Sequence, residues 1–181
     1  MATLRKANAY SKRKVTPYTR TSKRRQKSYI KTVPPQKIVK FDMGKTDAYH
    51  AGKFAYEITV FTDEKCQIRH NALEACRQYI NKKLDKETNK NFFFKIVPYP
   101  HHIQRENRML TGAGADRMQT GMQLSFGKAV GKSAIMKPGQ KLFIVAVSTA
   151  KEAQFTRNCF KQIKSKLPCK TSIVTEIHKS E

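Results

Sequence analysis

Residues 53–61 read KFAYEITVF, and this stretch decides the class of fold. Aromatic or branched apolar side chains occupy every second position from Phe54 to Val60, and the positions between them are small or polar. A period of two is typical of a β-strand that has one buried face. The stretch therefore predicts a half-buried strand in a sheet.

A helical period follows this strand. Apolar positions recur at helical spacing in residues 70–86, at Leu73, Cys76, Ile80 and Leu84. This spacing predicts an amphipathic helix with one buried face. Glu74 on the same helix is expected to pair with Arg77 or Gln78, one turn further on.

A second helix is predicted near the C-terminal end. Thr149 and Glu152 have the spacing of a capping box, in which the hydroxyl and the carboxylate each accept from a free amide at the helix start. We expect the helix to end at Pro168, because proline cannot continue it. Its predicted buried face consists of Ala153, Thr156, Phe160, Ile163 and Leu167.

The remaining regular segments predict strands. They cover residues 38–41, 91–97, 134–136, 141–147 and 172–177, with turns at 42–44 and 137–139. This order predicts an α+β fold, with an antiparallel or mixed sheet and two helices on one face. We expect one domain over residues 38–177, an extended basic arm over residues 1–37 and a short tail over residues 178–181.

The charge of the chain points to an anionic partner. Lysine and arginine number 37 against 13 acids, which gives a formal net charge of +24. Repulsion at this charge opposes a compact state unless an anion neutralises it. No apolar run is long enough for a transmembrane helix, and no secretory signal follows the basic start. We therefore expect nucleic acid as the partner and no membrane.

The first part of the chain is the most basic. Residues 1–41 hold thirteen lysines and arginines and no acid. Such a charge run is often a solvated tail. Evenly spread cations with tyrosines among them instead suit an extended arm that follows RNA phosphates and offers its rings to bases. The residues expected to bind RNA in this arm are Arg5, Tyr10, Lys12, Arg13, Lys14, Tyr18, Arg20, Lys23, Arg24, Arg25 and Lys27.

Residues 100–131 read PHHIQRENRMLTGAGADRMQTGMQLSFGKAVG and are the least regular part of the chain. The stretch is rich in glycine and has no sustained apolar period, which predicts a long loop that reaches out over residues 100–121. Long loops inside a compact domain are usually functional or disordered, and we expect function here. Lys128 and Lys132 lie next to glycines, where the backbone can approach phosphate, and both are expected to bind RNA.

Two glycine patterns in this stretch fall short of known nucleotide sites. Gly112 and Gly114 begin a dinucleotide fingerprint, but Arg117 stands at the third glycine position and no apolar strand precedes the pattern. Gly127 and Gly131 are one residue too close together for a phosphate-binding loop. No cofactor is expected.

No catalytic or metal-binding set emerges from the sequence. Neighbouring residues of a strand point to opposite faces, so His101 and His102 predict one packed and one exposed histidine. Asp116 beside Arg117 is interpreted as a turn residue or an ion pair. The four cysteines lack the close pairs of a zinc site and are expected to be reduced, mostly buried thiols. The sequence predicts neither an enzyme nor a metal site.

A longer set of motifs resembles one protein family. In chain order they are Pro-Tyr at 17–18, Val-Pro at 33–34, FDMG at 41–44, ALEA at 72–75, GAGADR at 112–117, Gly-Met at 121–122, FGK at 126–128 and Gly-Gln at 139–140. Together they resemble the large-subunit ribosomal protein L-sixteen family. The first three resemble its archaeal and eukaryotic branch, called L-ten-e.

This resemblance implies an α/β-hammerhead-type fold embedded in large-subunit ribosomal RNA, among neighbouring ribosomal proteins of cytoplasmic ribosomes. It implies that the long loop approaches tRNA near the peptidyl transferase centre, where RNA performs the chemistry. Members join the subunit late in assembly, which implies contacts with assembly factors. The loop positions that the resemblance implies near tRNA are His101, Arg105, Asn107, Arg108, Gly112, Gly114, Asp116 and Arg117.

Two other classes of function stay open at this point. A free RNA- or tRNA-binding factor that visits ribosomes would carry a similar charge and a similar arm. An RNA-processing enzyme would need a catalytic site, which the sequence does not indicate.

Overall fold

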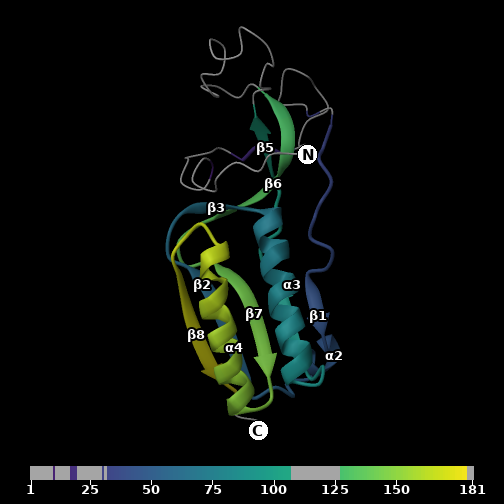
Figure 1. Ribbon diagram of the computed structural model, residues 1–181, viewed down its shortest axis with the longest axis vertical. Coiled ribbons are helices and arrows are strands. Elements are labelled where there is room, and N and C mark those ends of the chain that lie inside the picture. The colour runs from purple at the N-terminus through teal and green to yellow at the C-terminus, as the bar shows by residue number, and fades with distance from the viewer. Residues whose placement is uncertain (1–9, 11–16, 20–29, 31, 107–126, 179–181) are drawn as a thin grey trace.

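The computed structural model describes residues 10, 17–19, 30, 32–106 and 127–178. These residues form two antiparallel sheets, and two long helices lie on one face of the larger sheet (Figure 1). The predicted α+β class is confirmed. No described helix is long and apolar enough to span a membrane.

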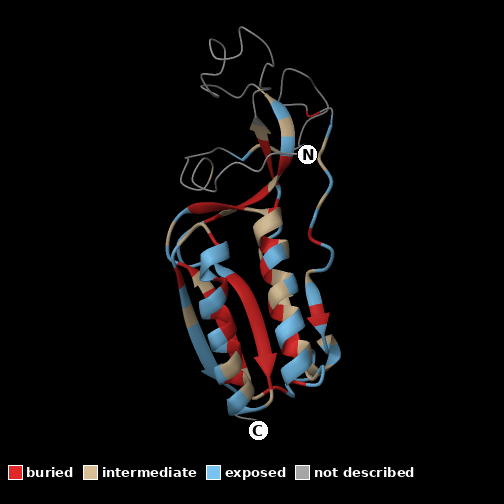
Figure 2. Cartoon of the chain, viewed as in Figure 1, coloured by how far each residue is buried: buried red, intermediate tan, exposed pale blue. Residues whose placement is uncertain are grey.

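The larger sheet has five strands, and every neighbouring pair is antiparallel. In spatial order the strands are β1 (Asp42–Gly44), β4 (Phe92–Ile96), β7 (Lys141–Val147), β2 (Tyr56–Thr62) and β8 (Thr171–Ile177). The central strand, β7, is buried along almost its whole length (Figure 2). The strand predicted within residues 53–61 is β2, but it is buried on both faces, because Glu57 and Thr59 are covered as well.

The long helices are α3 (His70–Glu87) and α4 (Ala150–Ile163). The predicted apolar face of α3 packs into the main core, where Leu73, Ile80 and Leu84 are fully buried. Full burial of each such side chain contributes about 1.5–3 kcal/mol to stability. Glu74 accepts hydrogen bonds from Arg77, at 2.7 Å, and from Gln78, at 3.0 Å, as predicted.

The start of α4 confirms the predicted capping box. The Glu152 backbone N–H donates to Thr149 Oγ1 at 3.3 Å, and the Thr149 backbone N–H donates to the Glu152 carboxylate at 3.0 Å. The predicted end at Pro168 is wrong, because α4 ends at Ile163 and a short 3-10 helix, η2 (Lys164–Lys166), follows it. Leu167 is extended, since a residue before proline is disfavoured in the helical region.

The predicted strand at residues 38–41 and the predicted turn at residues 42–44 are wrong. Residues 42–44 are themselves strand β1, which pairs with β4. Gly44 is needed for close approach, because a Cβ at this position would lie 2.0 Å from the Phe92 carbonyl oxygen. A short helix that the sequence did not predict, α2 (Thr46–His50), follows β1 and stacks Tyr49 on Phe93, with ring centroids 4.1 Å apart.

The smaller sheet extends from the end of the larger sheet at which α3 begins (Figure 1). In spatial order its strands are β3 (Cys66–Arg69), β6 (Lys128–Met136) and β5 (His102–Glu106). The predicted loop over residues 100–121 is therefore wrong at its start, because residues 102–106 form β5. Residues 107–126 lie outside the described part of the chain.

Buried polar side chains explain why apolar periodicity missed most of this sheet, of which only residues 134–136 were predicted as a strand. Gln67, Gln104 and Ser133 are 4%, 2% and 0% exposed. Ser133 Oγ donates to Gln67 Oε1 at 3.3 Å, and Gln104 Nε2 lies 3.5 Å from the same oxygen. Hydrogen bonds of this kind offset the cost of burying polar groups. The sheet thus combines a polar interior with a few apolar anchors such as Ile103.

The predicted turn at residues 137–139 is confirmed. Gly139 has a φ of +78°, in the left-handed region that glycine adopts without strain. The turn connects β6 of the smaller sheet to β7 of the larger sheet. It is one of the short connections between the two sheets, as is the one from β2 to β3.

Candidate nucleic-acid interface

The smaller sheet binds part of the basic arm. The Tyr18 backbone N–H donates to His102 Nδ1 at 3.0 Å, and the Ile103 backbone N–H donates to the Tyr18 carbonyl oxygen at 2.8 Å. Tyr18 and His102 are 84 positions apart in the chain. These two bonds fix residues 17–19 beside β5.

His102 holds the arm as a neutral acceptor. It is 6% exposed, and its pKa is lowered from 6.5 to about 4, first because burial disfavours the charged ring and then because Arg105 is close. A neutral ring can accept from the Tyr18 N–H, which a fully protonated ring cannot do. His101 is exposed, so the prediction of one packed and one exposed histidine is confirmed.

Arg105 covers the ring of Tyr18. The guanidinium carbon lies 3.5 Å from the ring centroid, which is a close cation–π contact. Arg105 was implied near tRNA and Tyr18 near ribosomal RNA, and the structure brings the two side chains together. The contact combines an aromatic face and a positive charge at one position.

A cavity of about 430 Å³ lies beside this pair. Its described lining carries two cations and no acid, and the exposed Lys128 approaches it from β6. A space of this size with cations at its wall can admit a phosphate and part of a nucleotide. The described lining residues are Tyr18, Ile30, Thr32, Arg105, Gly127, Lys128 and Ala129.

A second tyrosine of the arm meets a second arginine. Tyr10 lies under Arg69, with the guanidinium carbon 5.4 Å from the ring centroid. Arg69 ends β3, where the chain enters α3. The sequence reasoning did not select Arg69, although it stands directly before the predicted helix. Two arm tyrosines thus contact arginines of the smaller sheet.

A short row of aromatic rings adjoins this end of the molecule. Tyr99 stacks on Phe41 with centroids 5.3 Å apart, and the His101 ring lies 4.5 Å from Tyr99. Tyr99 is 45% exposed, so part of its ring is open to a partner. Exposed rings are common stacking surfaces for unpaired bases. The sequence reasoning selected only His101 of these three residues.

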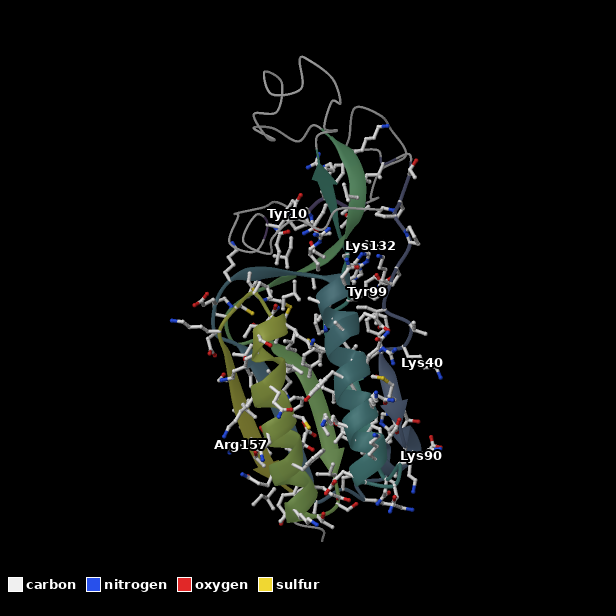
Figure 3. The ribbon with its side chains drawn as sticks, viewed as in Figure 1. Tyr10, Lys40, Lys90, Tyr99, Lys132 and Arg157 are labelled. Atoms are coloured by element: carbon white, nitrogen blue, oxygen red, sulfur yellow. The ribbon has the colours of Figure 1, made fainter. Side chains whose placement is uncertain are left out.

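These features gather at one end of the molecule. Figure 3 shows Tyr10, Tyr99 and Lys132 near the start of α3, whereas Lys90 and Arg157 lie towards the other end. Lys132 is half-buried on β6, next to Gly131. The arm contacts, the cavity and the aromatic row therefore lie at the same end of the molecule, which we call the arm-binding end.

The cysteines occupy structural positions. Cys66, Cys76 and Cys159 are buried, and all four cysteines are free thiols, as predicted. A hydrogen bond with Cys169 and burial raise the pKa of the Cys66 thiol. In the described ranges, no group of three or more histidine, cysteine or acidic side chains is arranged to hold a metal ion.

Comparison with known proteins gives the family. Residues 14–174 match the family model described as ribosomal protein L16p/L10e. The chain belongs to this family. The match covers the helical core and all of the arm-binding end except Tyr10.

Several archaeal L16p/L10e relatives cover nearly all of the chain. Each of the following is named large ribosomal subunit protein uL16. The relative from Methanospirillum hungatei is 43% identical over 153 residues, which are 84% of this chain and 87% of the relative. The relative from Hyperthermus butylicus is 41% identical over 173 residues, 92% and 90% of the two chains. The relative from Sulfolobus acidocaldarius is 42% identical over 175 residues, 94% and 92% of the two chains.

Many of the residues predicted to bind RNA or approach tRNA lie outside the described residues. In the arm these are Arg5, Lys12, Arg13, Lys14, Arg20, Lys23, Arg24, Arg25 and Lys27. In the loop they are Asn107, Arg108, Gly112, Gly114, Asp116 and Arg117. Among the predicted sites, the structure describes the surroundings of Tyr10, Tyr18, His101, Arg105, Lys128 and Lys132, and not their contacts with RNA.

Proposed function

We propose that the protein is a constituent of the large ribosomal subunit and binds ribosomal RNA through its arm-binding end. One observation carries the proposal: Tyr18 is fixed beside β5 under Arg105, next to a cavity that Lys128 also lines. Membership of the L16p/L10e family and the net charge of +24 support it. The protein itself serves as a structural component and not as an enzyme, and it needs no cofactor.

The side chains at this end suit two kinds of RNA contact. Arg105, Lys128 and Lys132 would bind phosphates, which fixes position without reading sequence. The exposed part of Tyr99 would stack on an unpaired base, as single-stranded RNA segments allow. RNA shape and a few unstacked bases would then provide the specificity.

The second part of the proposal concerns the segment between β5 and β6. The backbone of Glu106, at the end of β5, pairs with that of Lys128, at the start of β6. The two ends of the segment are therefore held next to each other. We infer that the segment reaches tRNA near the peptidyl transferase centre, where RNA performs the chemistry. This inference is based on the resemblance of residues 112–117 to the family motif and on the pairing of Glu106 with Lys128 at the two ends of the segment. Neighbouring ribosomal proteins and assembly factors would complete the set of partners in cytoplasmic ribosomes.

A sedimentation experiment tests the central proposal. A tagged copy of the full chain is expressed in cells, and ribosomes are pelleted through a high-salt cushion. We expect the protein to stay with the large subunit, because an embedded arm is not displaced by salt alone. Release into the supernatant would contradict the proposal and favour an RNA-binding factor that visits ribosomes transiently.

A further inference from the structure

The start of α3 differs from that of α4. Arg69 is the N-cap of α3, its side chain makes no capping hydrogen bond, and the first turn contains no acidic residue. The first amide groups of a helix have no acceptor within the helix, and the helix dipole concentrates positive charge there. Thr149 and Glu152 meet these needs at α4. Among the described residues, α3 has no equivalent cap.

His70, the first residue of α3, has a buried ring nitrogen without a partner. The residue is 3% exposed, and its Nδ1 makes no hydrogen bond. The Nε2 side of the ring faces Gly131, where an added Cβ would lie 3.3 Å away. Nδ1 is separated from Cα only by Cβ and Cγ, so it necessarily lies near the first turn of the helix. A polar group this deeply buried normally has a partner.

Neighbouring side chains also carry buried polar atoms that lack a partner. They are Nε of Arg69, Oδ1 of Asn71 and both amide atoms of Gln36. Gln36 precedes Lys37, which lies close enough to His70 to affect its pKa. Buried donors without acceptors destabilise a fold. Among the described residues, these buried polar atoms at the start of α3 therefore have no hydrogen-bond partner.

The positive charges around His70 indicate that a partner for these atoms would be negatively charged. The pKa of His70 is lowered to about 4, mainly by burial and further by Lys37, Arg69 and Lys132. The first acid of the helix, Glu74, is already bonded to Arg77. A water molecule could satisfy the free polar atoms but would leave the positive charge in place. An anion with several oxygen atoms would accept from the donors in this group, such as Arg69 Nε–H and the Gln36 amide NH₂, and would also neutralise the positive charge.

We propose that the start of α3, together with Lys37, Arg69, His70 and Lys132, binds one backbone phosphate of RNA. The phosphate oxygens accept from the amide groups of the first turn and from the Nε–H of Arg69. Rotation of the Asn71 amide presents its NH₂ group to the same anion. This inference rests on the proposed RNA binding and adds to it a defined phosphate site, at the opposite end of β3 from its Cys66.

RNA binding by charge-matched variants of the full-length protein tests the site. The affinity for a large-subunit ribosomal RNA fragment is measured over a series of salt concentrations for wild type, Arg69→Gln and Arg157→Gln. Both variants lose one positive charge, and Arg157 is exposed on α4, far from the site (Figure 3). We expect Arg69→Gln to reduce the slope of log affinity against log salt by about 0.7–0.9, the value for one phosphate. Arg157→Gln should keep the wild-type slope.

Lys37→Gln is a second test of the site, which still applies if Arg69→Gln fails to fold. Lys37 is exposed and lies outside helices and strands, so this variant should fold normally and still reduce the slope. Equal slopes for all variants, with a steep wild-type slope, would overturn the phosphate site and leave the proposed function intact. A wild-type slope near zero would overturn both.

A second measurement separates RNA from free phosphate. Inorganic phosphate is titrated into ¹⁵N-labelled full-length protein while the amide signals of residues 70–73 are followed. Shifts at these amides, lost in Arg69→Gln, together with the reduced RNA slope support the proposal. The same shifts without any change in RNA binding would identify a site for free phosphate and overturn the RNA assignment.

Discussion

One buried imidazole helps to hold the basic arm on the smaller sheet. His102 accepts a hydrogen bond from the Tyr18 backbone N–H, is buried, and lies close to Arg105. Acceptance requires the neutral ring, and both burial and the nearby positive charge favour it. An apolar side chain could also be buried at this position, but it could not accept a hydrogen bond from the Tyr18 N–H. This residue therefore makes the attachment of the arm sensitive to acid.

We predict that acid destabilises the protein through His102. Its pKa is about 4 in the folded state and 6.5 as the usual value, so the unfolded chain takes up the proton first as the pH falls. The free energy of unfolding should then decrease from about pH 6.5 to about pH 4. Chemical denaturation at several pH values measures this, and His102→Gln should show a weaker decrease. His50→Gln, on exposed α2, should keep the wild-type profile, and an unchanged profile in His102→Gln would contradict the prediction.

The contact between Arg105 and Tyr18 should contribute measurably to stability. A close cation–π pair that is partly shielded from water contributes about 0.5–1 kcal/mol. A double-mutant cycle with Tyr18→Leu and Arg105→Met, followed by denaturation, should give a coupling energy of about this size. Tyr18→Leu combined with Arg157→Met should give none. Equal coupling in both cycles would show that the ring and the guanidinium do not interact.

Among the elements, α4 depends on its first turn. The Thr149 hydroxyl and the Glu152 carboxylate each accept from a backbone amide at the helix start. We predict that Thr149→Ala lowers the free energy of unfolding by roughly 0.5–2 kcal/mol. Thr149→Ser keeps the acceptor and should restore most of the loss. Ser165→Ala, at an exposed hydroxyl after the helix, is the matched control and should have little effect. Equal losses in Thr149→Ala and Ser165→Ala would contradict the capping role.

Elements with an apolar period could be predicted from the sequence, and the others could not. The face of α3 and the central strand β7 follow standard patterns because their buried side chains are apolar. The smaller sheet instead buries Gln67, Gln104 and Ser133, whose hydrogen bonds form only after distant strands meet. Pattern alone cannot reveal a partner far along the chain.

The same reason limits prediction of the candidate site. The basic arm and the glycine-flanked lysines predicted Tyr18 and Lys128 as RNA-binding candidates, and the family resemblance implied Arg105 near tRNA. The structure gathers the three around one cavity. Arg69 and Lys37 were missed because each looks like an ordinary surface cation in the sequence. Their proposed role depends on the start of α3, which has no side-chain cap among the described residues, and this is visible only in the folded chain.

At the scale of the whole molecule, the folded domain should tolerate a shorter segment between β5 and β6. We predict that deleting residues 111–119 leaves folding intact, because the Glu106–Lys128 pairing closes the base of the segment. Circular dichroism and the thermal unfolding temperature should match wild type, whereas large-subunit maturation or tRNA handling should be impaired. Loss of folded signal in the deletion variant would show that these residues belong to the core. Normal ribosome function would contradict the proposed role near tRNA.

The strand order of the larger sheet has a consequence for synthesis of the chain. β2 is made early, but it lies between β7 and β8, and its Glu57 is paired with Ala146 on one side and with Glu176 on the other. Contacts between such distant positions slow folding, because a long loop must close before they form. The larger sheet can be completed only when the ribosome has translated β8. Until β7 is translated, β2 has neither of its final neighbours, and until β8 is translated it has only one.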